Sequence, residues 1–296
     1  MIRLAGWLVF LIALSSAGCA LAAGPEMQSA ATLQAQYAAL GERLNHSPFR
    51  RALILDSSDS SGHLQGDLYA LVDYPFATVA ASLSGPGQWC DVLILHLNTK
   101  YCRATVTGAG AVLTVRIGKK YPELLGDAYP VAFAYRLASK TSNFLDIRLN
   151  ADTGPLSTHD YLIQLAAIPV TGSRTFLHLT YSYAYGLTGQ LAMNTYLATI
   201  GRDKVGFTLT GKQSNGLPDY IGGERGLIER NTMRYYLAID SYLGSLAALP
   251  RDRFEKSLQS WFAATEKYPR QLHELDKTDY LNMKRSEYLR QQQPPQ

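Results

Sequence analysis

The stretch Gly66-Asp-Leu-Tyr-Ala-Leu-Val-Asp-Tyr-Pro-Phe76 decides how this chain folds. Apolar side chains occupy every second position within it, at Leu68, Ala70 and Val72. A period of two is typical of a β-strand with one buried face. Pro75 has no backbone donor, and its fixed φ suits the first turn of a helix. The stretch therefore predicts a strand that leads directly into a helix.

Two short helices are expected after this strand. The first would bury its apolar positions Ala77, Val79, Ala80 and Leu83. Gly85-Pro86-Gly87 interrupts the helical pattern, because Gly and Pro are poor residues for a helix interior. Residues 89–97, which begin at Trp89, then predict the second helix.

The N-terminus has the pattern of a secretory signal. Arg3 precedes an apolar run from Leu4 to Leu14, and small residues follow as far as Ala20-Leu-Ala22-Ala23. We expect residues 1–22 to be a signal peptide and the mature chain to begin near Ala23, in the periplasm or outside the cell. The alternatives are an uncleaved N-terminal anchor and a lipidated N-terminus at Cys19.

Composition narrows the classes of partner. The 296 residues are 47% hydrophobic, which is ordinary for a globular chain with one large or two small domains. The formal charge is +4, and removal of Arg3 with the signal leaves +3, without any block of Lys or Arg. We therefore expect no nucleic-acid partner. No later segment approaches the roughly 20 apolar residues of an integral membrane span, so we expect a soluble mature chain.

Residues 23–52 predict an N-terminal helical segment that lies on the main domain. Its apolar residues Leu33, Tyr37, Leu40 and Leu44 recur at helical spacing. Residues 56–62 are Asp, Ser and Gly only, and predict a polar turn before the first strand.

A sheet is expected over about a hundred residues after Cys102, because Gly and Pro punctuate the chain at intervals typical of antiparallel strands. The expected strands are residues 111–117, 131–139, 144–150, 161–168, 175–185 and 205–210. The segment 187–200 fits either a helix or an irregular lid.

The longest helix is predicted at residues 227–249, after Gly222, Gly223 and Gly226. Its apolar stripe consists of Ile228, Tyr235, Ile239, Tyr242, Leu246 and Leu249. Such a stripe must be buried, and the sheet is the one large partner expected. Pro250 ends this helix, a further helical extension covers residues 250–290, and residues 291–296 are expected to be a disordered tail.

This order of elements resembles the START-like helix-grip superfamily, which also holds the polyketide cyclases. The resemblance covers residues 53–249 and rests on the strand at residues 66–76 and the helix that begins Gly226-Leu-Ile-Glu-Arg-Asn-Thr-Met-Arg-Tyr-Tyr-Leu-Ala-Ile239. It implies an α+β fold in which a curled antiparallel sheet grips a long C-terminal helix around a mostly apolar cavity.

Tyrosines point to this cavity as the binding site. Tyr181, Tyr183 and Tyr185 share one face of their strand, and Tyr235 and Tyr242 belong to the helix stripe. Buried phenols need hydrogen-bond partners, which water or the polar group of a ligand would supply. The alternative is a packed core in which the hydroxyls reach the rim.

Arg230 and Arg234 lie one turn apart on the same helix and are candidates to hold a carboxylate or phosphate head group. The alternative is a solvated or salt-bridged helix edge. Together with the five tyrosines, they make seven candidate ligand-binding residues.

No catalytic, metal or cofactor site is predicted. The histidines at positions 46, 63, 96, 159, 178 and 273 include no pair at the i, i+4 spacing of a helical zinc site. His96 with Lys100 or Asp91 would serve acid–base chemistry only if these groups faced the cavity. There is neither a dinucleotide-binding fingerprint nor a nucleophile elbow.

Cys90 and Cys102 are expected to form a disulfide. An exported chain is oxidised outside the cytoplasm, and these two cysteines remain after the signal is removed. The alternative is a buried, unpaired couple, because free cysteine also packs well.

These observations predict an exported binding or carrier protein for an apolar, lipid-like small molecule. One alternative is a non-catalytic cell-envelope interaction protein with a filled core. The other is a cyclase- or hydratase-like enzyme that uses the same cavity.

Overall fold

The computed structural model describes residues 28–293 apart from residues 61, 188, 192–194 and 196–200. The predicted signal peptide, the mature start at Ala23 and most of segment 187–200 lie outside the described residues. The helices are α1 (Ala30–Asn45), α2 (Phe76–Leu83), α3 (Pro86–Leu93), α5 (Gly223–Ser245), α6 (Arg253–Thr265), α7 (Pro269–Leu272) and α8 (Lys277–Gln292). None of the helices in this part of the chain is long and apolar enough to cross a bilayer.

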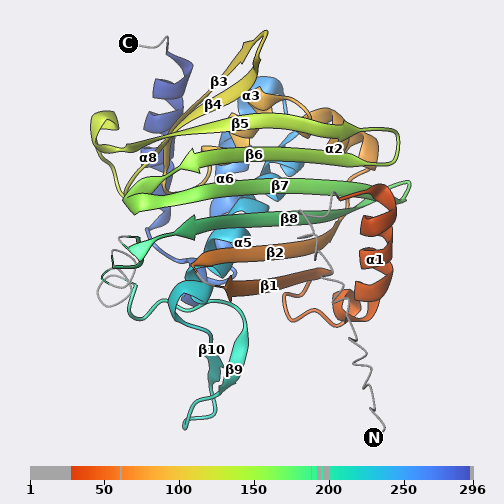
Figure 1. The fold of residues 1–296 in the computed structure, drawn as a ribbon, viewed down its shortest axis with the longest axis vertical. Helices are drawn as coiled ribbons and strands as arrows, with labels where there is room; N and C mark the ends of the chain where they lie inside the picture. Colours follow the sequence, from red (N-terminus) through yellow and green to blue (C-terminus); the bar gives the residue numbers. More distant parts are fainter. Residues whose placement is uncertain (1–27, 61, 188, 192–194, 196–200, 294–296) are drawn as a thin grey trace, which may run out of the picture.

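The strands form one large sheet and one small hairpin (Figure 1). The sheet contains β1 (Leu53–Ser60), β2 (His63–Val72), β3 (Thr99–Thr107), β4 (Gly110–Ile117), β5 (Tyr129–Lys140), β6 (Leu145–Thr153), β7 (Thr158–Thr171) and β8 (Arg174–Tyr185). Its order is β1-β2-β8-β7-β6-β5-β4-β3, with antiparallel neighbours throughout. The hairpin is β9 (Leu209–Lys212) and β10 (Pro218–Tyr220).

One face of the sheet packs against the long helix α5, and the other carries α1 (Figure 1). The larger core includes side chains from the inner face, α2, α3, α5, α6 and α8, whereas a smaller cluster lies under α1. The predicted fold class is therefore confirmed: the protein is α+β, with an antiparallel sheet around a long C-terminal helix.

Strand β2 connects the first strands of the sheet to β8, which is the last strand of the sheet in the sequence. Its side chains alternate between buried and half-buried along the whole strand, as the period of two predicts. It pairs with β8, more than a hundred residues later, so that Gly66 lies opposite Tyr181 and Leu64 opposite Tyr183. This register directs the inner-face tyrosines of β8 toward α5.

Two local predictions differ from the structure. Residues 56–60 belong to β1 rather than to a polar turn, because their backbone pairs with β2 from Asp56 opposite Asp67 to Ser60 opposite His63. Helix α3 begins at Pro86, inside the Gly-Pro-Gly triplet, and ends at Leu93. The break between two short helices is as predicted, since α2 ends at Leu83 and Gly85 is the N-cap of α3, but the second helix begins three residues earlier than expected because a proline at the first helical position has no donor to lose there.

The predicted disulfide is confirmed. Cys90 on α3 and Cys102 on β3 are bonded, with their Cα atoms 5.2 Å apart. The bond fastens α3 to the edge strand of the sheet, and both cysteines are buried.

The C-terminal helix α8 packs over the same region and holds the loop between α3 and β3. Lys284 Nζ donates hydrogen bonds to the carbonyl oxygens of His96 and Thr99, at 3.1 and 2.6 Å. Lys100 pairs with Glu287 of α8 at 3.0 Å, and both side chains are buried. The extension after Pro250 is thus part of the packed structure and fixes the position of His96.

Candidate functional site

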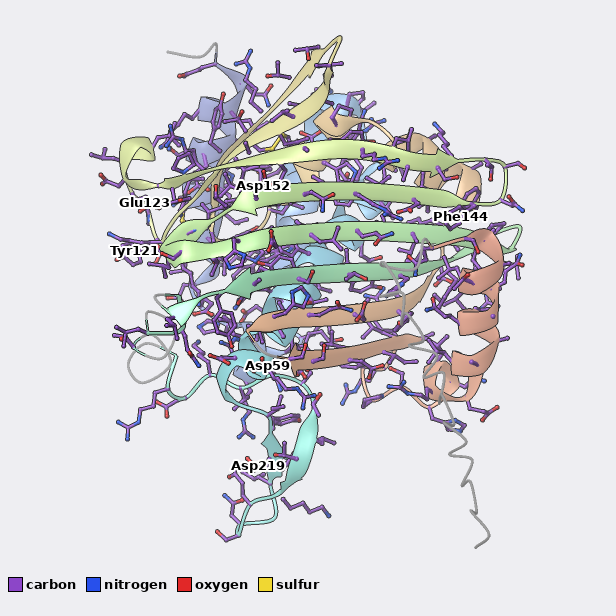
Figure 2. All side chains as sticks on the ribbon, viewed as in Figure 1. Asp59, Tyr121, Glu123, Phe144, Asp152 and Asp219 are labelled. Atoms are coloured by element: carbon purple, nitrogen blue, oxygen red, sulfur yellow. A yellow bond between two sulfur atoms is a disulfide. The ribbon has the colours of Figure 1, made fainter. Side chains whose placement is uncertain are left out.

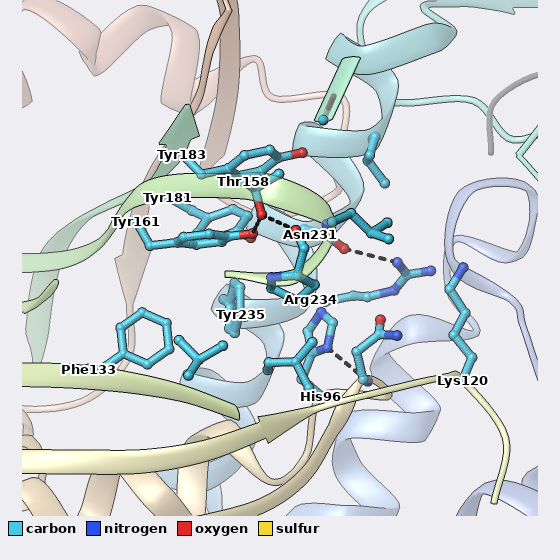
Figure 3. A pocket seen from close by; sticks show the side chains of 17 residues that line it. His96, Lys120, Phe133, Thr158, Tyr161, Tyr181, Tyr183, Asn231, Arg234 and Tyr235 are labelled. Atoms are coloured by element: carbon cyan, nitrogen blue, oxygen red, sulfur yellow. Dashed lines mark hydrogen bonds between the residues drawn. The ribbon is translucent and has the colours of Figure 1, made fainter. Parts of the chain in front are cut away.

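A cavity of about 250 Å³ lies between the inner face of the sheet and α5 (Figure 3). Its wall comes from three parts of the chain. The sheet contributes Val131, Phe133, Thr158, Tyr161, Tyr181 and Tyr183; α5 contributes Leu227, Asn231, Arg234 and Tyr235; connecting segments contribute His96, Asn98, Ile117, Lys120, Pro155, Leu156 and Gly189.

The cavity reaches the surface at one end of the sheet. Leu156 lines it and is also 65% exposed, in the short connection between β6 and β7. The connection between β4 and β5, which carries Tyr121 and Glu123, lies at the same end, whereas Phe144 marks the opposite end (Figure 2). The opening is therefore formed by loops.

Aromatic rings form one side of the cavity. Tyr161 on β7 stacks on Tyr183 with ring centroids 5.2 Å apart, and Tyr181 meets Tyr235 of α5 edge-on at 5.0 Å. The Tyr161 hydroxyl bonds to Thr158 Oγ1 at 2.6 Å, and burial raises the pKa of this phenol to about 12. The wall is thus aromatic, largely apolar and neutral.

Three phenol hydroxyls in this wall lack a hydrogen-bond partner within the described part of the chain. Those of Tyr181, Tyr183 and Tyr235 make no hydrogen bond with any residue that the structure describes. Burial raises the pKa of each above its ordinary value, so all three remain protonated. Each can donate one hydrogen bond and accept others from a molecule in the cavity.

His96 lies at the polar end of the cavity and is a neutral imidazole. Burial, and then the charges of Arg234, Lys284 and Lys120, hold its pKa well below the ordinary value. The ring stacks on Tyr235 at 4.8 Å, and its Nδ1 accepts a hydrogen bond from the Asn98 backbone at 3.2 Å.

The Nε2 atom of His96 is buried and makes no hydrogen bond of ordinary geometry with a described residue, although the amide of Asn231 is its polar neighbour. Because Nδ1 accepts, the proton of the neutral ring is assigned to Nε2. His96 therefore presents an N–H donor at this end.

Three cationic side chains surround one carboxylate at the polar end of the cavity. Arg234 and Lys120 both contact Oε1 of Glu274, at 2.7 and 2.6 Å, and Lys204 lies 3.3 Å from Oε2. Although burial opposes it, the charges of Arg234 and Lys120 lower the pKa of Glu274 to about 2. Burial, followed by the charge of Arg234, lowers the pKa of Lys120 to about 8.

The structure places four of the seven candidate ligand-binding residues in the cavity wall: Tyr181, Tyr183, Arg234 and Tyr235. Tyr185, the last residue of β8, points to the start of α5 instead, where its hydroxyl donates to Glu224 at 2.7 Å. Arg230 is fully buried and donates to the Val205 carbonyl at 3.3 Å.

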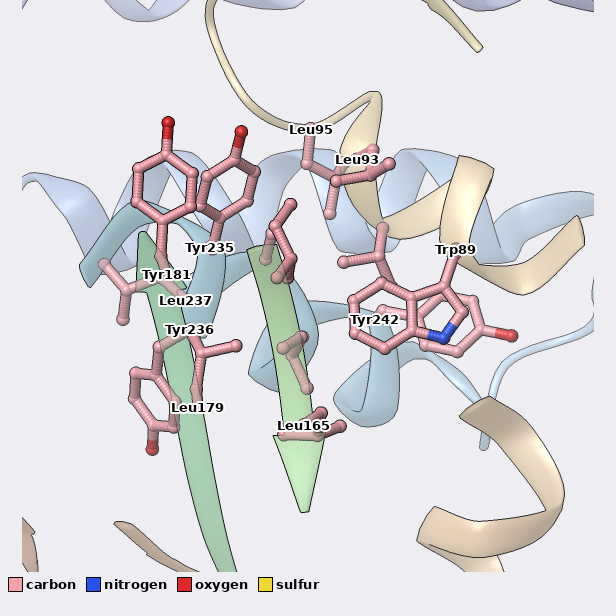
Figure 4. Packing of buried hydrophobic residues seen from close by; sticks show 14 of the residues in the cluster. Trp89, Leu93, Leu95, Leu165, Leu179, Tyr181, Tyr235, Tyr236, Leu237 and Tyr242 are labelled. Carbon is pink, nitrogen blue, oxygen red and sulfur yellow. The ribbon is translucent and has the colours of Figure 1, made fainter. Parts of the chain in front are cut away.

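Tyr242 lies away from these residues. Figure 4 shows it apart from Tyr181 and Tyr235 in the core, and its hydroxyl donates to the Ser82 carbonyl of α2 at 3.3 Å. It belongs to a separate hollow of about 170 Å³ that Asp91 also lines.

The groups considered for acid–base chemistry are separated. His96 faces the cavity, but Asp91 lies in the hollow beside Tyr242, and Lys100 is paired with Glu287. Among the described residues that line the cavity, none is Asp or Glu.

A larger hollow of about 1,030 Å³ lies outside the sheet–helix interior, between the segment before β1 and helices α5 and α6. Its charged lining residues are Arg50, Arg51, Asp73, Arg174, Asp240 and Lys267. Arg51 and Asp240 already pair across it at 3.1 Å. This charged wall does not suit an apolar ligand.

Sequence reasoning missed Tyr161, Lys120, Asn231 and Glu274. Tyr161 begins a predicted strand, so the period of two could have placed its side chain on a face of the sheet. Asn231 precedes Tyr235 by one helical turn, so the helical period could have placed it on the same face of the helix as Tyr235. Lys120 and Glu274 are 154 residues apart in the sequence, and no local pattern connects them.

No family model matches this sequence, and no curated protein matches it. Among solved structures, a norcoclaurine synthase point mutant from Thalictrum flavum in complex with a transition-state analogue is 12% identical, with a TM-score of 0.34 over 47% of this chain and 86% of that one. An aromatase/cyclase from Streptomyces sp. R1128 is 16% identical, with a TM-score of 0.32 over the same shares. Ara h 8.0201 is 10% identical, with a TM-score of 0.36 over 62% of this chain and 99% of that one.

Proposed function

We propose that this protein is an exported carrier that binds an apolar, lipid-like ligand between the sheet and α5. The observation that carries the proposal is the set of three phenol hydroxyls, on Tyr181, Tyr183 and Tyr235, that face the cavity without a partner among the described residues. Buried polar groups in folded proteins nearly always have a partner. Water fills this role in the empty protein, and a polar group of the ligand replaces it.

The cavity volume limits the enclosed part of the ligand. At about 250 Å³ it exceeds the roughly 150 Å³ cavity that holds benzene, but it is below the range of about 300–1,000 Å³ for drug-sized ligands. A ring system or a short chain fits inside, and any longer part of the ligand emerges past Leu156.

Binding is better supported than acid–base catalysis. General acid–base chemistry needs titratable groups that face one another across the substrate. The described wall offers no carboxylate, and the low pKa of His96 keeps its ring neutral at physiological pH. The remaining titratable cation near neutrality, Lys120 with its pKa lowered to about 8, is paired with Glu274.

Export rests on the signal pattern of residues 1–22 and agrees with the Cys90–Cys102 disulfide. Disulfides persist in oxidising compartments and are rare in reduced ones.

The first experiment is native mass spectrometry of the protein purified from its producing cells, followed by extraction and identification of the bound molecule. We expect an adduct that disappears on denaturation. The second is calorimetric titration with 2-naphthol, a neutral two-ring probe that matches the cavity.

Tyr183→Trp should fill the cavity and weaken 2-naphthol binding about tenfold or more. Tyr129→Trp is the matched control, because Tyr129 is 41% exposed and does not line the cavity. If the purified protein carries no molecule and binds no apolar probe, the carrier proposal fails and the interaction-protein alternative replaces it.

A further inference from the structure

The polar end of the cavity has buried donors without acceptors. His96 presents Nε2–H, whose polar neighbour is the Asn231 amide, and Arg234 presents Nε–H, and neither atom makes a hydrogen bond of ordinary geometry with a described residue. Both side chains are deeply buried, with His96 4% and Arg234 1% exposed. Two such donors at one end of a cavity indicate an acceptor that comes from outside the protein.

The charges at this end of the cavity also favour an acceptor that carries negative charge, because cations outnumber carboxylates. Glu274 is shared by Arg234, Lys120 and Lys204, so one carboxylate pairs with three cations. Segment 186–201, which contributes Gly189 to the wall, contains no acidic residue. A monoanion placed against Arg234 and Lys120 would reduce this excess of positive charge in a partly desolvated site, where the attraction is stronger than in water.

The rest of the wall fits a flat ring. Tyr161 and Tyr183 stack at 5.2 Å, and Phe133 meets Tyr161 edge-on at 6.3 Å. Figure 3 shows these rings on one side of the cavity, with Arg234 and Lys120 on the other. A ligand that contacts both sides has an aromatic body and one anionic end.

We infer that the cavity selects aromatic monocarboxylates, whose carboxylate is held by Arg234 and His96 beside Lys120. The inference rests on the proposed function and narrows its ligand class. Because Arg234 Nε and His96 Nε2 are closed to solvent in the empty cavity, binding includes a small shift of these two side chains, after which both donate to the carboxylate and the ring lies against the tyrosines.

The test compares two probes of nearly the same shape on the unaltered mature protein. 2-Naphthoate carries the negative charge, and 2-naphthamide replaces it with a neutral amide. We expect calorimetry to show naphthoate binding about tenfold tighter or more. If both bind equally, the selectivity is wrong but the carrier proposal stands. If neither binds and no molecule copurifies, both fail.

A matched pair of variants locates the selectivity. Lys120→Gln removes a cation from the cavity wall, and Lys119→Gln removes one from the adjacent, exposed position. We expect Lys120→Gln to weaken naphthoate about tenfold with naphthamide unchanged, and Lys119→Gln to change naphthoate less than about twofold. Equal effects of the two variants on naphthoate would overturn the assignment of the charge effect to the cavity.

Discussion

The close approach of β2 to α5 gives a sharp test of how the sheet grips the helix. Gly66 faces Thr232, and a Cβ added at Gly66 would lie 2.2 Å from Thr232 Oγ1 and 3.1 Å from its Cβ. Thr232 is fully buried, and its hydroxyl donates to the Ile228 carbonyl at 2.8 Å, so it has little freedom to move. Gly66→Ala therefore forces the strand and the helix apart.

The expected change in the free energy of unfolding of Gly66→Ala is the sum of two opposing effects. Overpacking a well-filled core costs about 1–3 kcal/mol. Gly66 lies in strand β2 and is not among the glycines with positive φ, so alanine adds no backbone strain and restricts the unfolded chain, a gain of about 0.4–1 kcal/mol. We expect a net decrease in the free energy of unfolding of about 1–2 kcal/mol.

Urea unfolding followed by circular dichroism measures this loss, provided that the m-value is unchanged. Gly41→Ala is the control: Gly41 lies within α1, a Cβ there would meet nothing within 4 Å, and alanine should stabilise the protein by about 0.5–1 kcal/mol. Thr232→Ala removes the atom at 2.2 Å, so the double variant should recover about 1 kcal/mol relative to additivity. A Gly66→Ala protein as stable as the wild type would refute this packing of β2 on α5.

Three further predictions concern other parts of the chain. Replacing both Cys90 and Cys102 by alanine should lower the free energy of unfolding by about 3 kcal/mol, because the bond closes a loop across 12 positions; a reductant should destabilise the wild type and leave the double variant unaffected. The pKa of Glu274, lowered from 4.5 to about 2, should contribute about 3 kcal/mol of stability that is complete above pH 4.5 and lost as pH falls toward 2; urea unfolding across this range should show the loss in the wild type but not in Glu274→Gln. The exported protein should begin near Ala23, and an intact mass that retains the signal, or carries a diacylglyceryl group on Cys19, would contradict this.

Local periodicity predicted the elements that form the cavity. The period of two in β8 places Tyr181 and Tyr183 on one face, and helical spacing places Tyr235 in the apolar stripe of the predicted long helix. Both patterns depend on residues close in sequence. The cysteine pair was also predictable, because the export expected from the signal pattern and the cysteine count leave few alternatives.

The same periodicity does not say how far along an element a cavity extends. Tyr242 shares the apolar stripe of α5 with Tyr235, but seven residues of helix separate them by about 10 Å along the axis. At that distance the hydroxyl of Tyr242 reaches the Ser82 carbonyl of α2 rather than the tyrosines of the sheet. Tyr185 likewise lies two residues, or about 7 Å, beyond Tyr183, and its partner is Glu224 at the start of α5.

By itself, the sequence determined the individual strands and helices, the disulfide pair and the tyrosine faces, because each follows from short-range spacing, cysteine count or turn chemistry. The class of fold followed from the resemblance of the order of these elements to helix-grip domains. The tertiary structure alone decided the polar end of the cavity. Lys120 comes from the loop after β4, Arg234 from α5 and Glu274 from the segment between α7 and α8. These groups meet only because the sheet, the long helix and the C-terminal extension pack on one another, and electrostatic interactions depend on distance in space rather than along the chain.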